Sequence, residues 1–202
     1  MRLELFDEAI VDMRRDVFAD FGFEGLSSGD VIEDGNLEAA IEESGYRHGK
    51  SVALRFLRER PRSVHEIRCR LMRDRIEPKT IDVLIKSLSD QNLLNDAEFA
   101  HSWVDSRVGL RPKGMFLVRC ELRAKGVREN LIEEALAYGY PGELEVARPL
   151  VARRATLLAG ESRTGFRRKL GAYLKRRGFS SETIVHLVDA GWDSYGNSQP
   201  DS

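Results

Sequence analysis

The sequence has 202 residues, of which 42% are hydrophobic and 32% are charged, enough for one sizeable domain or several small ones. Cys69 and Cys120 are too few for a disulfide framework, and no CxxC or HxxxH pair of the kind that binds zinc occurs. Because no apolar stretch approaches the roughly 20 residues that span a bilayer, we expect a soluble protein of a reducing compartment, the cytoplasm.

The formal net charge of -1 conceals a strong asymmetry along the chain. Residues 1–44 contain 3 basic and 13 acidic residues, a net charge of -10, whereas the remainder carries 29 basic and 20 acidic residues, a net charge of +9. A basic body can bind phosphate groups or an acidic protein surface. The alternative is that its arginine-rich helices are simply well solvated.

Residues 1–50 are predicted to form an acidic N-terminal extension. An amphipathic helix is predicted over 3–21, ending at Gly22, because apolar residues recur there every three or four positions. These residues are Leu3, Phe6, Ile10, Met13, Val17 and Phe21. A loop over 22–35 and a short helix over 36–43 follow. Two roles stay open: the extension caps the rest of the protein, or it competes with nucleic acid for the basic body.

A segment of about 50 residues then recurs three times. Residues 67–85 align with 118–136 at a shift of 51 (118 minus 67), and a third copy follows at a shift of 52 (170 minus 118). The alignment superimposes the apolar residues Ile67, Val118 and Leu170. Three copies in register are not expected by chance, so the sequence predicts a repeat protein.

Two aligned positions of the repeat indicate local structure. One stands where a helix must end in a left-handed residue, a conformation that favours glycine. The residues there are Arg75, Gly126 and Gly178. The other position is occupied by Cys69, Cys120 and Ala172, which indicates a small packing position.

Each copy is predicted to contain three short helices. Ser63 and Glu66 form a capping box before the second helix of the first copy, and no alternating apolar run predicts a strand. The predicted fold class is therefore all-α, with three tandem three-helix repeats in an elongated, curved, solenoid-like molecule. The predicted segments are repeat 1 (51–94), repeat 2 (95–142), repeat 3 (143–192) and a disordered tail (193–202).

Two groups of basic residues are candidates for binding a partner or the phosphate groups of DNA. One lies on the outer face of the second helix of repeat 3. Its members are Arg167, Arg168, Lys169, Lys175 and Arg176. The other lies on a loop of repeat 2, at Arg111 and Lys113. Arg107 is expected to pack within its own repeat, because Arg60 and Arg154 recur at the same offset.

The sequence does not predict an enzyme. Its four histidines are scattered without a serine or cysteine partner at a motif spacing, and it contains no glycine-rich phosphate-binding loop. We assign no catalytic, cofactor-binding or metal-binding residue. Trp103 and Trp192 are predicted to anchor the core and not to stack on bases.

Three motifs together resemble the RecX family of bacterial regulatory proteins. They are LLNDAEFA (93–100), the spacing from Arg107 to Gly114, and ELRAKGV (121–127). The resemblance covers roughly residues 51 to 192, is strongest in the second repeat, and does not extend to residues 1–50. It implies three tandem three-helix repeats, as the internal alignment independently predicts.

The resemblance also implies a function in DNA repair by homologous recombination and in the SOS response. RecX proteins bind the RecA filament on DNA and modulate it, in most cases by lowering its ATPase, strand-exchange and co-protease activities. The implied partners are RecA and, weakly and without sequence specificity, single- or double-stranded DNA; we expect a monomer. Two alternatives remain: a nucleic-acid-binding helical module that acts without RecA, and a protein scaffold.

Overall fold

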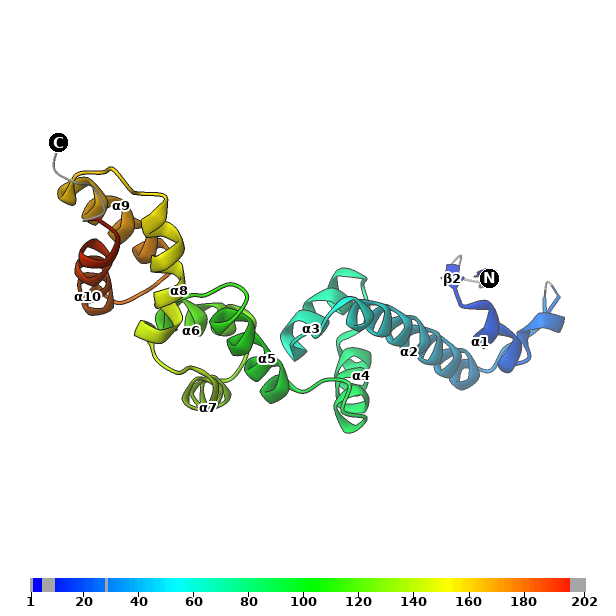
Figure 1. Ribbon diagram of the computed structural model, residues 1–202. Coiled ribbons are helices and arrows are strands. Elements are labelled where there is room, and N and C mark those ends of the chain that lie inside the picture. The colour runs from blue at the N-terminus through cyan, green and yellow to red at the C-terminus, as the bar shows by residue number, and fades with distance from the viewer. Residues whose placement is uncertain (1, 5–9, 28, 197–202) are drawn as a thin grey trace. The chain divides into compact units, whose positions relative to one another are not determined.

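The structure is a computed structural model that describes residues 2–4, 10–27 and 29–196 (Figure 1). The chain divides into two compact units, residues 1–95 and 96–202. The first unit contains one helix triplet and an N-terminal module, and the second contains two helix triplets. The predicted all-α protein of three-helix repeats is confirmed, apart from one short strand pair at the N-terminus.

The triplet of the first unit consists of α2 (Asp34–Glu59), α3 (Val64–Arg73) and α4 (Pro78–Asp90). Ile67 and Leu71 on α3 and Ile81 on α4 are fully buried at its centre. The predicted capping box begins α3: the Glu66 amide donates to the Ser63 hydroxyl over 3.2 Å, and the Glu66 carboxylate accepts from the Ser63 amide over 3.3 Å. Burial follows the predicted apolar face.

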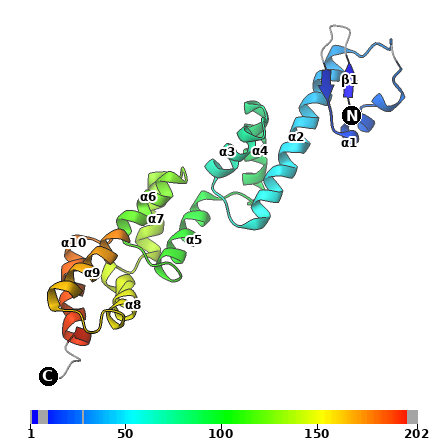
Figure 2. The same ribbon diagram turned by 90° about the horizontal axis from the view of Figure 1, so that it is seen from above.

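The predicted helix over 3–21 is wrong. Strands β1 (Arg2–Glu4) and β2 (Ile10–Asp12) pair in antiparallel register, and α1 spans only Arg15–Asp20 (Figure 2). A 3-10 turn follows at Phe23–Gly25. Of the apolar residues that predicted the helix, Leu3 lies opposite Val11 in the strand pair and Val17 is buried from α1, whereas Phe6 lies outside the described residues. Gly22 does end α1, with a φ of 74°.

The short helix predicted over 36–43 is the first part of α2, which continues without interruption past residue 50. Gly49 does not break this helix, because it provides close packing. A Cβ at Gly49 would lie 2.6 Å from Leu84 Cδ1 on α4. The beginning of α2 supports the N-terminal module, where Ala40 is buried with Met13, Val17 and Phe23.

The second unit consists of two triplets around one continuous core. The first triplet is α5 (Asp96–Val108), α6 (Met115–Ala124) and α7 (Glu129–Gly139). The second is α8 (Glu143–Thr156), α9 (Arg163–Arg176) and α10 (Ser181–Gly191) (Figure 1). Val118 on α6 and Leu170 on α9 are fully buried, as their counterpart Ile67 is on α3. The three aligned residues therefore occupy equivalent core positions.

The left-handed helix ends are confirmed: φ is 60° at Arg75, 72° at Gly126 and 81° at Gly178. The prediction that Cys69, Cys120 and Ala172 occupy a small packing position is wrong, because the two cysteines are only half-buried and Ala172 is exposed. The disordered tail is corrected at its start, where Trp192–Gly196 forms a π-helical turn. The rest of that tail, residues 197–202, lies outside the described residues.

Candidate nucleic-acid interface

The two triplets of the second unit meet through backbone contacts at a junction formed by residues 112–115, 140–143 and 177–180. The Gly114 amide donates to the Arg177 carbonyl over 2.8 Å, and the Arg177 guanidinium donates to the Pro112 carbonyl over 3.1 Å. Gly114 packs directly on the backbone of Gly178. The loop before α6 is thereby attached to the C-terminal end of α9.

Glu143, at the start of α8, joins two helix starts at this junction. Its carboxylate accepts from the Met115 amide over 3.1 Å and from the Ser180 amide over 2.8 Å. Burial opposes ionisation of Glu143, but hydrogen bonds from Ser180, Thr183 and Met115 outweigh it and hold the pKa of the carboxyl below its usual value. The nearby Tyr140 hydroxyl donates to the Lys113 carbonyl over 2.9 Å.

The loop residues Arg111 and Lys113 have different environments. Arg111 is exposed and has no ion-pair partner among residues 29–196, so its charge faces solvent. Lys113 is half-buried, and its ammonium forms an ion pair with Glu121 on α6. We therefore retain Arg111 as a candidate contact and expect Lys113 to contribute mainly to the internal packing of repeat 2.

Glu121 is the centre of an internal polar cluster. Its carboxylate accepts from the Arg107 Nε over 2.7 Å and from the Trp103 indole over 2.9 Å. The Arg107 guanidinium lies 4.2 Å from the centroid of the Trp103 ring, and only 9% of Arg107 is exposed. Arg107 therefore packs within its repeat as predicted, and Trp103 contributes to the core.

The predicted basic residues of α9 are all exposed, but they differ in pairing. Arg167 forms an ion pair with Asp189 on α10, and Lys169 forms one with Glu161. Arg168, Lys175 and Arg176 have no such partner in the described part of the chain. These three cations keep their full charge available to an external anion.

The junction gathers cations from segments that are distant in the sequence. The Arg111 loop is hydrogen-bonded to the end of α9, where Lys175 and Arg176 lie. By contrast, the arginines of α6 are neutralised by α7, with Arg119 2.7 Å from Glu133 and Arg123 2.6 Å from Glu129. Arg111, Lys175 and Arg176 thus remain without an ion-pair partner among the described residues.

Two exposed cations on α8 and one at the start of α9 were not identified from the sequence. They are Arg148, Arg153 and Arg163, and none has an ion-pair partner in the part of the chain that the structure describes. A helical periodicity argument could have found them, because they lie outside the apolar positions Val146, Leu150 and Phe166.

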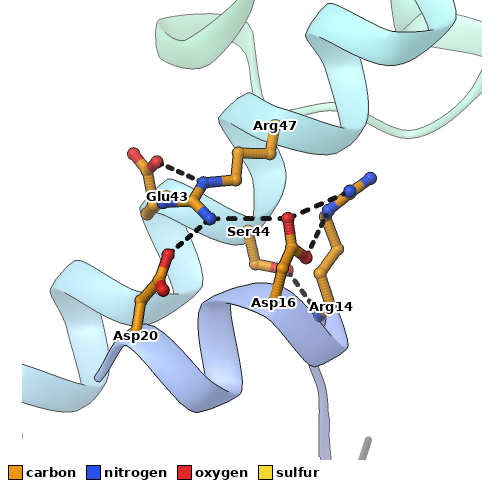
Figure 3. Close-up of polar contacts among 6 residues, drawn as sticks. All are labelled: Arg14, Asp16, Asp20, Glu43, Ser44 and Arg47. Carbon is orange, nitrogen blue, oxygen red and sulfur yellow. Dashed lines mark hydrogen bonds and ion pairs between the residues drawn. The ribbon is translucent and has the colours of Figure 1, made fainter. Parts of the chain in front are cut away.

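The N-terminal module has the opposite charge. Arg47 on α2 donates to Glu43 and Asp20 over 2.6 Å each, and more weakly to Asp16, which also accepts from Arg14 (Figure 3). Hydrogen bonding from Arg14, aided by Arg47, lowers the pKa of Asp16 to about 2. These arginines are thus neutralised internally, while other carboxylates stay exposed. The exposed carboxylates include Glu24, Glu33, Asp34, Glu38 and Glu42.

This module is attached firmly to the helix that supports it. The Arg14 amide donates to the hydroxyl of Ser44, which is buried on α2, over 3.0 Å (Figure 3). Its acidic surface disfavours phosphate groups, so the N-terminal module is not part of the candidate interface. No group of three or more possible metal ligands occurs among the described residues, and none of their helices is long and apolar enough to cross a membrane.

Comparisons with known proteins agree with this architecture. The family model for the first three-helix domain of RecX matches residues 50–88, and the model for the second three-helix domain of RecX matches residues 95–136. In a crystal structure of RecX from Lactobacillus salivarius, 97% of the chain matches 73% of this one, with a TM-score of 0.63 and 26% identity. A second RecX crystal structure, 22% identical, shares the fold with a TM-score of 0.68 over 92% of each chain.

Curated relatives extend the likeness over most of the sequence. The regulatory protein RecX of Prosthecochloris aestuarii is 32% identical over 149 residues, which make up 74% of this chain and 97% of the relative. That of Geobacillus kaustophilus is 30% identical over 82% of this chain, which spans 62% of the length of that relative. By its matched repeats and its identity to these relatives, the chain belongs to the RecX family of regulatory proteins.

Proposed function

We propose that this protein binds RecA filaments on DNA in the cytoplasm and lowers their ATPase, strand-exchange and co-protease activities. Family membership supports the regulatory role. The observation that carries the proposal furthest is the group of unpaired cations at the junction of repeats 2 and 3, namely Arg111, Lys175 and Arg176. Such a surface suits a filament that presents DNA phosphates beside protein.

The proposed mechanism is electrostatic attachment without base recognition. Arginine and lysine contacts to phosphate position a protein on nucleic acid but do not read its sequence. Binding would therefore be strong at low salt, weak at high salt, and insensitive to base composition. Once attached, the two helix triplets of the second unit, which share one core, would interfere with the movements that accompany ATP hydrolysis and filament growth.

ATP hydrolysis by RecA on single-stranded DNA tests this proposal. The wild-type protein should inhibit hydrolysis at less than one molecule per RecA subunit. The triple variant Arg111→Glu, Lys175→Glu, Arg176→Glu should lose at least tenfold in inhibitory potency, because three phosphate contacts become repulsive. Full inhibition by this variant would contradict the role of the junction, and no inhibition by the wild type would contradict the proposed function.

A matched control variant distinguishes the effect of the junction residues from the effect of the change in net charge. The triple variant Arg55→Glu, Arg58→Glu, Lys86→Glu makes the same charge change at exposed cations of α2 and α4, which have no ion-pair partner among the described residues. It should inhibit RecA nearly as well as the wild type. If the wild-type protein binds DNA without affecting RecA, the alternative of a nucleic-acid-binding module is favoured.

A further inference from the structure

The polar cluster of repeat 2 has a modified counterpart in repeat 3. The arginine that corresponds to Arg107 is Arg154, 47 residues later, and it lies on α8 as Arg107 lies on α5. On the second helix of each repeat, where the shift is 52, Tyr173 takes the place of Glu121. Repeat 3 thus keeps the arginine and replaces its carboxylate with an aromatic ring.

A second cation completes this arrangement in repeat 3. Arg177 corresponds to Lys125 at the same shift of 52. The Arg177 guanidinium lies 4.8 Å from the centroid of the Tyr173 ring, and the Arg154 guanidinium lies 5.5 Å from it. Neither arginine has a carboxylate partner among the described residues. Two positive charges therefore flank one neutral ring.

The charge balance distinguishes repeat 3 from the other repeats. Arg60, the equivalent residue of repeat 1, is paired with Glu66 at 2.7 Å, and Arg107 is paired with Glu121 at 2.7 Å. In repeat 3 the Arg154 Nε is buried and has no hydrogen-bond acceptor among the described residues. A buried donor of this kind is unfavourable when it stays unpaired, and an arginine cannot avoid it by losing its proton.

We propose that Arg154, Tyr173 and Arg177 form a binding site for one phosphate group of nucleic acid, which would pair with the arginines of repeat 3 as the Glu121 carboxylate pairs with Arg107 in repeat 2. The guanidinium groups would donate to the phosphate oxygens, and the Tyr173 ring would keep them apart and oriented. This inference deepens the proposed function by assigning a defined phosphate site, but its test requires no RecA.

The surroundings favour a nucleic-acid phosphate over an acidic side chain of a protein. Arg153 on α8 and Arg176 on α9 adjoin the site in the sequence, and both are exposed and unpaired in the described part of the chain. A single carboxylate could pair with Arg154 and Arg177 but not with the neighbouring cations. A chain of phosphates could also reach the neighbouring cations, which gives binding a steep dependence on salt.

The decisive variant is Tyr173→Glu, which restores the carboxylate of repeat 2 and so fills the site from within. Binding of the full chain to a fluorescent single-stranded oligothymidylate is measured by anisotropy over a range of salt concentrations. We expect roughly tenfold weaker binding, and a slope of log affinity against log salt that is shallower by about 0.7 for each phosphate that the variant no longer binds. The melting temperature should not fall, because both arginines gain a partner.

Two further variants complete the test. Val185→Glu adds the same charge at an exposed position of α10 and should change the salt slope little. Arg154→Gln removes one donor without adding an anion. If Tyr173→Glu proves unstable, this variant must show the shallower slope instead. Tyr173→Phe retains the ring and should bind like the wild type.

The possible outcomes test the phosphate site and the proposed function independently. If Tyr173→Glu binds DNA as Val185→Glu does, the phosphate site is overturned. If it binds DNA normally but loses its effect on RecA, the site takes an acidic protein side chain, and the phosphate assignment is likewise wrong. If DNA binding behaves as expected while the wild-type protein leaves RecA unaffected, the phosphate site stands and the proposed function fails.

Discussion

Gly114→Ala should separate repeats 2 and 3, because this glycine lies against backbone and not against a movable side chain. A Cβ at Gly114 would be 2.0 Å from the Gly178 carbonyl oxygen and 2.5 Å from the Phe179 amide nitrogen. No rotamer change relieves such contacts, so the loop must move away from α9. That movement would break the 2.8 Å hydrogen bond from the Gly114 amide to the Arg177 carbonyl.

The expected cost of Gly114→Ala follows from these two effects. Overpacking against a fixed neighbour costs about 1–3 kcal/mol, and the broken backbone hydrogen bond adds about 1 kcal/mol. We therefore expect the free energy of unfolding of the second unit to fall by about 2–4 kcal/mol, measured by urea denaturation. DNA binding should weaken in native buffer, because the loop that carries Arg111 would no longer be attached to the end of α9, which carries Lys175.

Gly171→Ala provides the matched control. A Cβ at Gly171, within α9, would lie 3.6 Å from Ile184 Cγ2, an ordinary van der Waals distance. Because alanine favours a helix over glycine by about 1 kcal/mol, this variant should be neutral or more stable than the wild type. If Gly114→Ala unfolds at the same urea concentration as Gly171→Ala, the account of the junction is wrong.

Three other predictions concern charged groups. Glu143→Gln should lower the free energy of unfolding by about 1 kcal/mol at pH 7. The folded-state pKa of Glu143 lies below its unfolded value of 4.5. The stabilisation by the ionised carboxylate is therefore fully present above pH 4.5 and is lost as the pH falls through the lower folded-state pKa. Equal differences at pH 7 and at pH 3 in urea titrations would count against this linkage. Arg107→Ala should cost about 2 kcal/mol, because it removes one charged donor to the Glu121 carboxylate while Lys113 and Trp103 still bind it, and a loss below about 1 kcal/mol would show that the cluster is dispensable. Glu33→Gln with Glu38→Gln should tighten DNA binding at low salt if the acidic module competes for the basic surface, whereas unchanged affinity would leave the module a purely structural role.

The repeats could be predicted from the sequence because their cores depend on local periodicity. Ile67, Val118 and Leu170 recur at nearly constant shifts and are all fully buried. The capping box of Ser63 and Glu66 was equally predictable, since it needs only four neighbouring residues. Both features arise within one helix or its start, so no knowledge of distant contacts was required.

The N-terminal module could not be predicted in the same way. The spacing of Met13 and Val17 is compatible with a long helix, and only the pairing of β1 with β2 and the packing on α2 select the observed structure. The length of α2 was underestimated for a related reason. Gly49 resembles a helix breaker in the sequence, but it is buried against Leu84.

The sequence identified basic residues of the candidate interface, but it did not show which of them form ion pairs. The basic residues predicted on α9 are exposed, as the sequence indicated, yet Arg167 and Lys169 form ion pairs with acids 22 and 8 residues away. Lys113 is likewise neutralised by Glu121. Ion pairs of this kind depend on how helices pack, so the free cations could be separated from the paired ones only in the folded structure.

Binding to preformed RecA filaments tests the central claim most directly. Wild-type protein, the junction triple variant and the control triple variant are each sedimented with RecA assembled on single-stranded DNA. Our account predicts that the wild type and the control sediment with the filament, while the variant at Arg111, Lys175 and Arg176 stays in the supernatant. Equal sedimentation of all three proteins, or of none, would contradict the claim that the junction of repeats 2 and 3 attaches this protein to the filament.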